Sequence, residues 1–227
     1  MSLYRLLKHL LPLFLLTSCA NFAPVPLDYR QGAIVESISS AVYLSINASG
    51  MNLAGSGYLV YRRPDQLHLV VLTPFGTTIL EAFALGERIV LIYPSQSTAY
   101  VGKFDELPDK NGLQGWRLMR WVMDADPSAD KQLSESVERI GKLGFSEKLS
   151  YKNGLVVAKE SQTGDKVLYS KYVAIKGIPV ASEFELQNSR EDSIRITLDE
   201  PDVNISLDDT VFMPRLDGLT VVPLSDL

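Results

Sequence analysis

Short segments of alternating apolar and polar residues cover most of the chain, and residues typical of turns separate them at regular intervals. Such alternation is typical of β-strands with one face buried. In the first half of the chain it predicts strands over residues 42–48, 55–62, 67–72, 78–85, 88–93 and 98–103. Six consecutive strands with tight connections indicate an antiparallel meander, which either closes into a barrel or curls around another element.

The second half of the chain returns to the same pattern after a stretch of different character. Asn153-Gly154 is a strong hairpin signal between two apolar segments. The pattern predicts strands over residues 148–151, 155–160, 166–175, 178–187 and 193–198. Two short edge segments, 203–205 and 212–214, and a tail over 218–224 complete the prediction.

Two segments show apolar residues at helical spacing. Residues 31–40 are expected to form a short helix. A longer helix, which covers residues 128–144, is expected to open at Asp126-Pro127, with Pro127 at its first position, and to end at Gly144. Its apolar stripe consists of Leu133, Val137, Ile140 and Leu143.

A third predicted helix, residues 113–124, has an unusually wide apolar arc. Its polar residues Arg117, Arg120 and Asp124 share one narrow face. The remaining arc consists of Trp116, Leu118, Met119, Trp121, Val122 and Met123. An arc wider than the usual stripe of about 100° favours burial on most sides. Two interpretations stay open: a core helix that fills the mouth of the sheet, or a lid over an apolar cavity.

The connection between the strands 67–72 and 78–85 carries a large aromatic residue where small polar residues are usual. Thr73, Pro74 and Gly76 fit a tight turn, and Phe75 lies at its tip. The ring either folds back on a neighbouring strand or projects toward a membrane or an acyl chain. Pro74, Phe75 and Gly76 are therefore the candidate membrane- or cargo-contacting loop.

The N-terminus has the pattern of a targeting segment. Arg5 and Lys8 precede a short apolar run over residues 10–16, which is too short to cross a bilayer. Residues 16–19 resemble the bacterial lipobox, in which cleavage precedes a Cys that then receives a diacylglycerol. Cys19 is the single Cys of the chain, so it cannot form an internal disulfide.

These features divide the chain into a lipoprotein signal peptide over residues 1–18, a tether over 19–30 and one domain over 31–227. Ala20, which follows the Cys, resembles the enterobacterial sorting signal for the outer membrane. The expected location is therefore the outer membrane, with the domain lipid-anchored and facing the periplasm.

Composition and motifs exclude several functions. A net charge of -5 argues against a nucleic-acid partner. His68 is isolated in a predicted strand, and no nucleophile elbow, zinc-protease motif, phosphate loop or paired Cys ligands occur. We therefore expect neither an enzyme nor a bound metal or cofactor.

Residues 69–80, which include Leu72-Thr73-Pro74-Phe75-Gly76-Thr77-Thr78, resemble the LolA/LolB lipoprotein-localisation family, and LolB in particular. Residues 118–122 also resemble a helical segment of LolB, and residues 211–221 resemble the end of LolA. The resemblance implies an α+β fold, mainly β with helices: an incomplete, strongly curved antiparallel β-barrel with a helical lid over an apolar cavity.

The resemblance also implies a function. The protein would bind the acyl chains of lipoproteins or phospholipids and help to insert them into the outer membrane, with a periplasmic LolA-type carrier as a further partner. Phe75 would contact bilayer or cargo. Trp116, Leu118, Met119, Trp121, Val122 and Met123 would line or gate the cavity. The alternative is an envelope sensor or scaffold domain of the same fold that binds a protein partner without lipid transfer.

Overall fold

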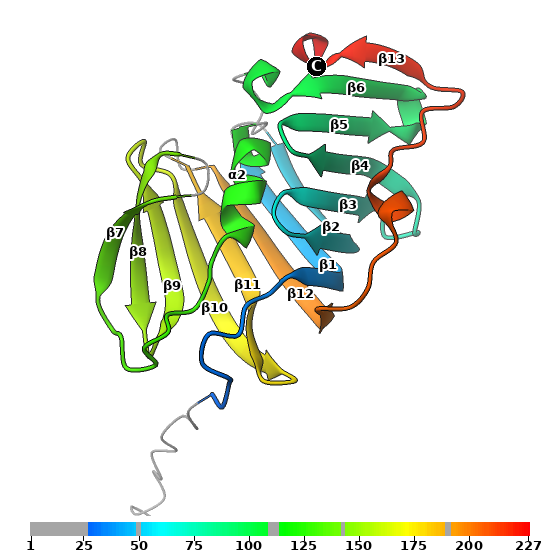
Figure 1. Ribbon diagram of the computed structural model, residues 1–227. Coiled ribbons are helices and arrows are strands. Elements are labelled where there is room, and N and C mark those ends of the chain that lie inside the picture. The colour runs from blue at the N-terminus through cyan, green and yellow to red at the C-terminus, as the bar shows by residue number, and fades with distance from the viewer. Residues whose placement is uncertain (1–26, 49–50, 109–113, 142–143, 189–191) are drawn as a thin grey trace, which may run out of the picture.

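Thirteen strands form one continuous, curved sheet, and one α-helix lies against its concave face (Figure 1). The computed structural model describes residues 27–48, 51–108, 114–141, 144–188 and 192–227. The strands of the first half are β1 (Ser37–Ala48), β2 (Met51–Arg62), β3 (Gln66–Leu72), β4 (Thr78–Leu85), β5 (Arg88–Tyr93) and β6 (Thr98–Lys103). Those of the second half are β7 (Ser136–Ile140), β8 (Ser146–Lys152), β9 (Leu155–Ser161), β10 (Lys166–Ile175), β11 (Ile178–Gln187), β12 (Ser193–Val203) and β13 (Thr220–Pro223).

The helix α2 (Gln114–Met123) connects the two halves of the chain. The short 3-10 helices are η2 (Pro94–Gln96), η3 (Phe104–Glu106), η4 (Asp209–Phe212) and η5 (Leu224–Asp226).

The strand order is β13-β6-β5-β4-β3-β2-β1-β12-β11-β10-β9-β8-β7. Neighbouring strands are antiparallel except β13, which pairs with β6 in parallel. The two halves join where β1 pairs with β12, with Val42 opposite Leu198. This pairing connects segments that lie far apart in the sequence and makes a single sheet of two meanders.

Side chains alternate between the two faces of the sheet, as strand geometry requires. In β3, Leu67, Leu69 and Val71 point into the concave core. β5 is apolar on both faces because both are covered: Ile89 lies in the concave core, and Val90 lies in a second cluster on the convex face.

A C-terminal strap, which we define as residues 204–219, covers that convex cluster. It leaves β12, crosses the outer face of β3 to β5 and leads into β13 (Figure 1). Leu216 and Leu219 of the strap pack on the cluster. The guanidinium of Arg62 lies 4.8 Å from the ring centre of Phe212 and ion-pairs with Asp209 at 2.6 Å.

Two predicted helices are wrong. Residues 31–40 form a turn at residues 31–32 and then the first strand, because Ile38, Val42 and Leu44 alternate into the core. Residues 128–144 contain the edge strand β7 in place of a helix. Of the expected apolar stripe, Val137 and Ile140 are exposed, Ile140 by 70%, and Leu143 lies outside the described residues. Pairing with β8 determines the backbone of this segment. The segment 212–214 is also not an edge strand, because Phe212 ends η4.

The predicted fold class is wrong as well. Strands make up 56% of the structure and helices 10%, with one α-helix among the described residues, so the molecule is not an α+β fold with a helical lid. The only α-helix among them is packed inside the curve of the sheet and belongs to the core. The described residues of the helix predicted over 128–144 do not cover the sheet. Those of β7 extend it by pairing with β8.

Candidate functional site

The turn between β3 and β4 holds Phe75 away from the rest of the molecule. The side chain is 95% exposed. Its backbone is fixed by Thr73, whose hydroxyl accepts hydrogen bonds from the backbone N–H groups of Phe75 at 3.3 Å and Thr77 at 3.1 Å. Gly76 has a φ of +79°, which glycine adopts without strain. The turn is therefore an ordered projection that presents one aromatic ring to solvent.

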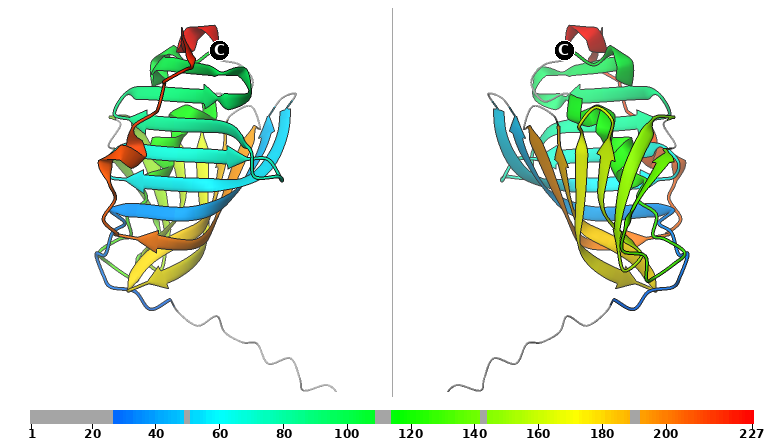
Figure 2. Two further views of the ribbon diagram at one scale, coloured as in Figure 1. Left: turned by 90° about the vertical axis from the view of Figure 1, so that its right-hand side faces the viewer. Right: turned by 90° about the vertical axis from the view of Figure 1, so that its left-hand side faces the viewer.

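Phe75 lies at one end of strands β1 to β4, where the chain carries no charged side chains. In an antiparallel meander, alternate strand connections lie at the same end, so the paired residues Ala48 and Met51 lie at the same end of the sheet as the β3–β4 turn. These ends of β1 and β2 and the β3–β4 turn point to the same side of the molecule in the left view of Figure 2. The sequence has no Asp, Glu, Lys or Arg over residues 37–61 or 66–80. We call the described residues of the two hairpin ends, 45–48, 51–54 and 72–78, the uncharged rim.

The opposite ends of the same strands are charged. They and the turns that follow them carry Arg62, Arg63, Asp65, Glu87 and Arg88. The uncharged rim is also bounded on one side, because Asp192 precedes Ser193, which pairs with Asn47. The low charge is therefore a property of these two hairpin ends and not of the whole molecule.

The convex face behind the uncharged rim carries two exposed tyrosines. Tyr43 of β1 is 55% exposed and Tyr58 of β2 is 57% exposed. Tyr58 lies opposite Ala41, so the two tyrosines are diagonal neighbours on the same face. Tyrosine combines an apolar ring with a hydroxyl and suits a boundary between water and an apolar phase.

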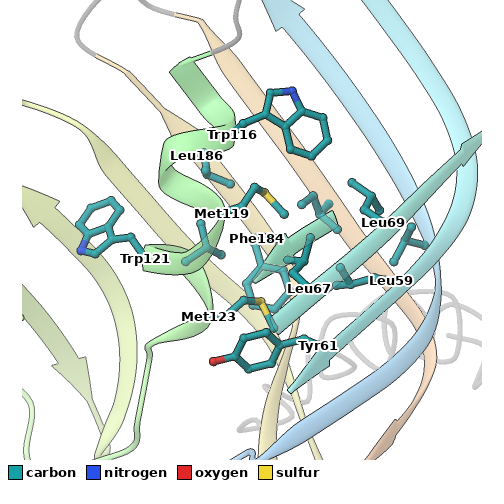
Figure 3. Packing of buried hydrophobic residues seen from close by; sticks show 14 of the residues in the cluster. Leu59, Tyr61, Leu67, Leu69, Trp116, Met119, Trp121, Met123, Phe184 and Leu186 are labelled. Atoms are coloured by element: carbon teal, nitrogen blue, oxygen red, sulfur yellow. The ribbon is translucent and has the colours of Figure 1, made fainter. Parts of the chain in front are cut away.

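The predicted cavity and lid residues of α2 form part of the concave core. Trp116, Met119, Trp121, Val122 and Met123 are buried, and Leu118 is half-buried. Figure 3 shows Trp116 and Met119 on the side of the helix toward Leu69, whereas Trp121 points the other way. The helix thus packs against both halves of the curved sheet, which explains the width of its apolar arc.

A buried charged network holds the C-terminal end of α2. The ammonium of Lys159, a residue with no exposed surface, donates to the carbonyls of Trp121 at 2.8 Å and Asp124 at 2.7 Å. It lies 3.4 Å from the carboxylate of Glu147. That carboxylate also accepts from Trp121 Nε1 at 2.5 Å and Arg139 Nε at 2.7 Å. A cation at the C-terminal carbonyls of a helix is electrostatically favourable.

Burial lowers the pKa of Lys159 to about 8, although the nearby carboxylates of Glu147 and Asp124 act in the opposite direction. Burial also raises the pKa of Tyr169 well above its ordinary value. The Tyr169 hydroxyl donates to the carbonyl of Val122 at 2.7 Å, so it serves as a neutral donor to the same helix end.

The space left beside α2 is small. A cavity of about 40 Å³ lies between α2 and the sheet, lined by Met123, Tyr169, Val180 and Phe184 among others. Pockets for small molecules usually measure about 300–1,000 Å³. This cavity could therefore take an acyl chain only if side chains that line it moved.

Sequence reasoning did not find the charged network. Lys159 directly follows the apolar run 155–158 and precedes Glu160, and a lysine at the end of such a run was the available signal. Its partners Glu147 and Arg139 lie on other strands, so only the strand pairing brings them together.

Several expectations fall on other parts of the chain. Cys19, the lipobox and residues 1–26 lie outside the described residues. In the part of the chain that the structure describes, no group of three or more His, Cys, Asp or Glu residues could hold a metal ion. Within the same residues, no helix has the length and apolar character needed to span a membrane.

A scan against family models finds no match, and a search of curated proteins finds none either. Solved structures do resemble the fold. A DUF1329 family protein from Desulfovibrio piger has a TM-score of 0.56 and 15% identity, covering 78% of this chain and 90% of that chain. A LolA superfamily protein from Nitrosomonas europaea has a TM-score of 0.52 and 11% identity, and the match covers 82% of this chain and 93% of that chain. The chain thus has a LolA-like fold, and the likeness does not single out LolB.

Proposed function

We propose that this protein binds acyl chains of lipoproteins or lipids and helps to place them in the outer membrane, to which Cys19 anchors it on the periplasmic side. The observation that carries the proposal is the ordered exposure of Phe75 on the uncharged rim. An aromatic ring kept in water by a rigid turn costs hydrophobic free energy that contact with a bilayer would recover.

The absence of charge on the rim supports contact with a membrane. Moving a charged side chain into the apolar part of a bilayer is costly. The uncharged rim avoids this cost, while Tyr43 and Tyr58 suit the depth of the lipid headgroups. Because the rim has no basic residue, its affinity would not depend on anionic lipids.

The concave face supplies the surface for the acyl chain. The chain would replace the side chains of Met119 and Met123, which are unbranched and adopt several rotamers. The cavity of about 40 Å³ beside Met123 is the space from which such an exchange would start. A periplasmic LolA-type carrier would deliver the cargo.

Membrane contact is tested with the variant Phe75→Glu in a Cys19→Ser background, which removes the acceptor for the acyl anchor. Burying a Phe side chain contributes about 1.5–3 kcal/mol, so binding to phosphatidylcholine vesicles should weaken by about tenfold to a hundredfold. Ile140→Glu is the matched control, because Ile140 is 70% exposed on the edge strand β7, away from the rim. Equal losses in both variants, or none in Phe75→Glu, would refute the role of Phe75.

Acyl binding is tested separately with a fatty acid brominated in mid-chain, since bromine quenches nearby tryptophan. The chain has two Trp residues, and both lie on α2. We expect strong quenching in the wild type and in Phe75→Glu, and weak quenching in Trp116→Phe, where only Trp121 on the other side of α2 remains. Absent quenching, or equal quenching in Trp116→Phe, would contradict binding at this face.

The cavity beside Met123 is too small for an acyl chain as it stands, and this observation favours the alternative function, a sensor or scaffold domain that binds a protein partner. Native mass spectrometry separates the two functions. Phospholipid or lipopeptide that copurifies with the protein supports lipid binding, whereas its consistent absence supports the scaffold.

A further inference from the structure

A groove on the convex face, opposite the side that holds α2, has the size of a ligand site. It measures about 540 Å³ and lies between the outer face of β3 to β5 and the C-terminal strap. This volume falls in the range of small-molecule pockets. Phe83, Ile92 and Leu219 give it an apolar lining, and His68, Glu81 and Asp217 place polar groups along it.

Glu81 is the unusual residue of the groove. It lies in the middle of three paired strands, opposite Val70 and Ile92. Burial raises the pKa of its carboxyl. No hydrogen bond or ion pair reaches this carboxylate from any residue that the structure describes, including Arg215, which lines the same groove.

Two other carboxylates on the convex face, those of Glu183 and Glu185, are paired with cations. Glu183 lies 2.8 Å from the ammonium of Lys171, and this hydrogen bond lowers the pKa of Glu183. Glu185 lies 2.6 Å from Arg195. A partly buried carboxylate without a cation is unfavourable unless something else supplies the positive charge. Glu81 therefore differs from its counterparts by lacking a donor.

His68 offers a second acceptor beside Glu81. It lies opposite Phe83 across the strand pair, and the two rings stack with centroids 4.1 Å apart. Burial lowers the pKa of His68, and a hydrogen bond to the backbone of Val211 offsets part of this effect. In the neutral ring that bond uses Nδ1–H, so Nε2 is an acceptor, and Nε2 is buried without a partner.

We propose that this groove binds a primary ammonium group carried on an apolar chain. The ammonium would pair with the Glu81 carboxylate and donate to His68 Nε2 or Asp217 as the strap adjusts. The apolar part would pack on Phe83, Ile92 and Leu219. An ammonium group has three donors and no acceptor, which matches the two acceptors without a partner at Glu81 and His68 Nε2. This inference is independent of acyl binding on the concave face.

The test uses hexylammonium as the probe, with calorimetry and the imidazole NMR signals of the full chain as readouts. We expect saturable binding with a dissociation constant on the order of 1 mM, typical of so small a ligand. Hexanol and hexanoate, which have the same chain length without a positive charge, should bind at least tenfold more weakly.

Glu81→Gln should weaken hexylammonium binding about tenfold, because a charge-assisted hydrogen bond is replaced by a neutral one. This variant should fold, since the carboxylate it removes has no partner. Glu183→Gln is the matched control on the same face and should leave the binding unchanged. Absent binding, or binding that Glu81→Gln does not weaken, would overturn the proposal.

The ammonium group could belong to a soluble amine or to a lipid headgroup, and vesicles distinguish these sources. Phosphatidylethanolamine in phosphatidylcholine vesicles should strengthen vesicle binding of the wild type and not of Glu81→Gln if a headgroup enters the groove. Hexylammonium binding without this vesicle effect assigns the groove to a soluble amine. Phe75→Glu should leave hexylammonium binding intact in either case, which separates this test from that of the membrane contact.

Discussion

Replacing the buried lysine tests how α2 is held in the concave face. In Lys159→Met the side chain keeps its approximate length but loses the ammonium. Two carbonyls at the end of α2, those of Trp121 and Asp124, then lose donors that lie 2.8 Å and 2.7 Å away. The Glu147 carboxylate loses a cation at 3.4 Å and keeps its bonds to Trp121 and Arg139.

The expected loss of stability follows from these contacts. A buried acceptor left without a partner costs about 1–3 kcal/mol. Removing one partner of a buried ion pair typically costs about 3–5 kcal/mol. Because Arg139 continues to neutralise Glu147, we expect the free energy of unfolding to fall by about 3–4 kcal/mol, a large share of a typical total of about 5–15 kcal/mol.

Urea unfolding monitored by circular dichroism measures this loss, and tryptophan fluorescence reports on α2 in the same samples. Lys166→Met is the matched control, because Lys166 forms an exposed ion pair with Glu160 at 3.2 Å on the neighbouring strands. Its effect should stay within about 0.5 kcal/mol. The double variant Lys159→Met/Glu147→Gln should lose less than the sum of the single losses. A Lys159→Met variant within about 1 kcal/mol of the wild type would refute this account of α2.

Three further predictions concern the outer face and the sheet. Burial raises the pKa of Glu81 in the folded state, so the unfolded chain releases this proton at a lower pH than the folded protein does. The free energy of unfolding should therefore fall as the pH rises from about 4.5 through the folded pKa of Glu81. Glu81→Gln should remove this decline and raise the urea midpoint at pH 7, and an unchanged pH profile would contradict the prediction. The pKa of His68 is lowered in the folded state, so stability should fall as the pH is lowered from about 6.5 toward the folded pKa, and His68→Gln should flatten this part of the unfolding profile. Gly57→Ala should destabilise the protein by about 3 kcal/mol or more, because its Cβ would lie 1.8 Å from the carbonyl oxygen of Val70; a thermal midpoint close to that of the wild type would show that β2 and β3 can separate at little cost.

The strands were predictable where the apolar pattern is local. The segments 67–72, 78–85, 88–93 and 98–103 coincide with β3, β4, β5 and β6 or fall within one residue of them. Alternation in these segments comes from one buried face, and the turns between them contain Gly or Pro. The sequence also indicated an exposed role for Phe75 without excluding a folded-back ring, and the structure shows the ring in solvent.

The helix predicted over residues 128–144 failed because an apolar spacing does not show what surrounds it. Val137 and Ile140 fit a helical stripe, but this segment lies next to β8, where hydrogen bonds at a sheet edge outweigh helix propensity. The assignment of α2 to a lid failed for a related reason. A wide apolar arc requires burial on several sides, and only the curvature of the sheet shows that both halves cover the helix.

The sequence by itself determined most of the strand pattern, the tight turn that carries Phe75 and the charge-free segments around it, because each depends on residues that are neighbours along the chain. Tertiary structure alone brought the charge-free hairpin ends together, buried Lys159 beside Glu147 and left Glu81 without a cation under the strap. These features depend on pairings between distant strands, such as β1 with β12, and no local pattern specifies which distant residues will meet.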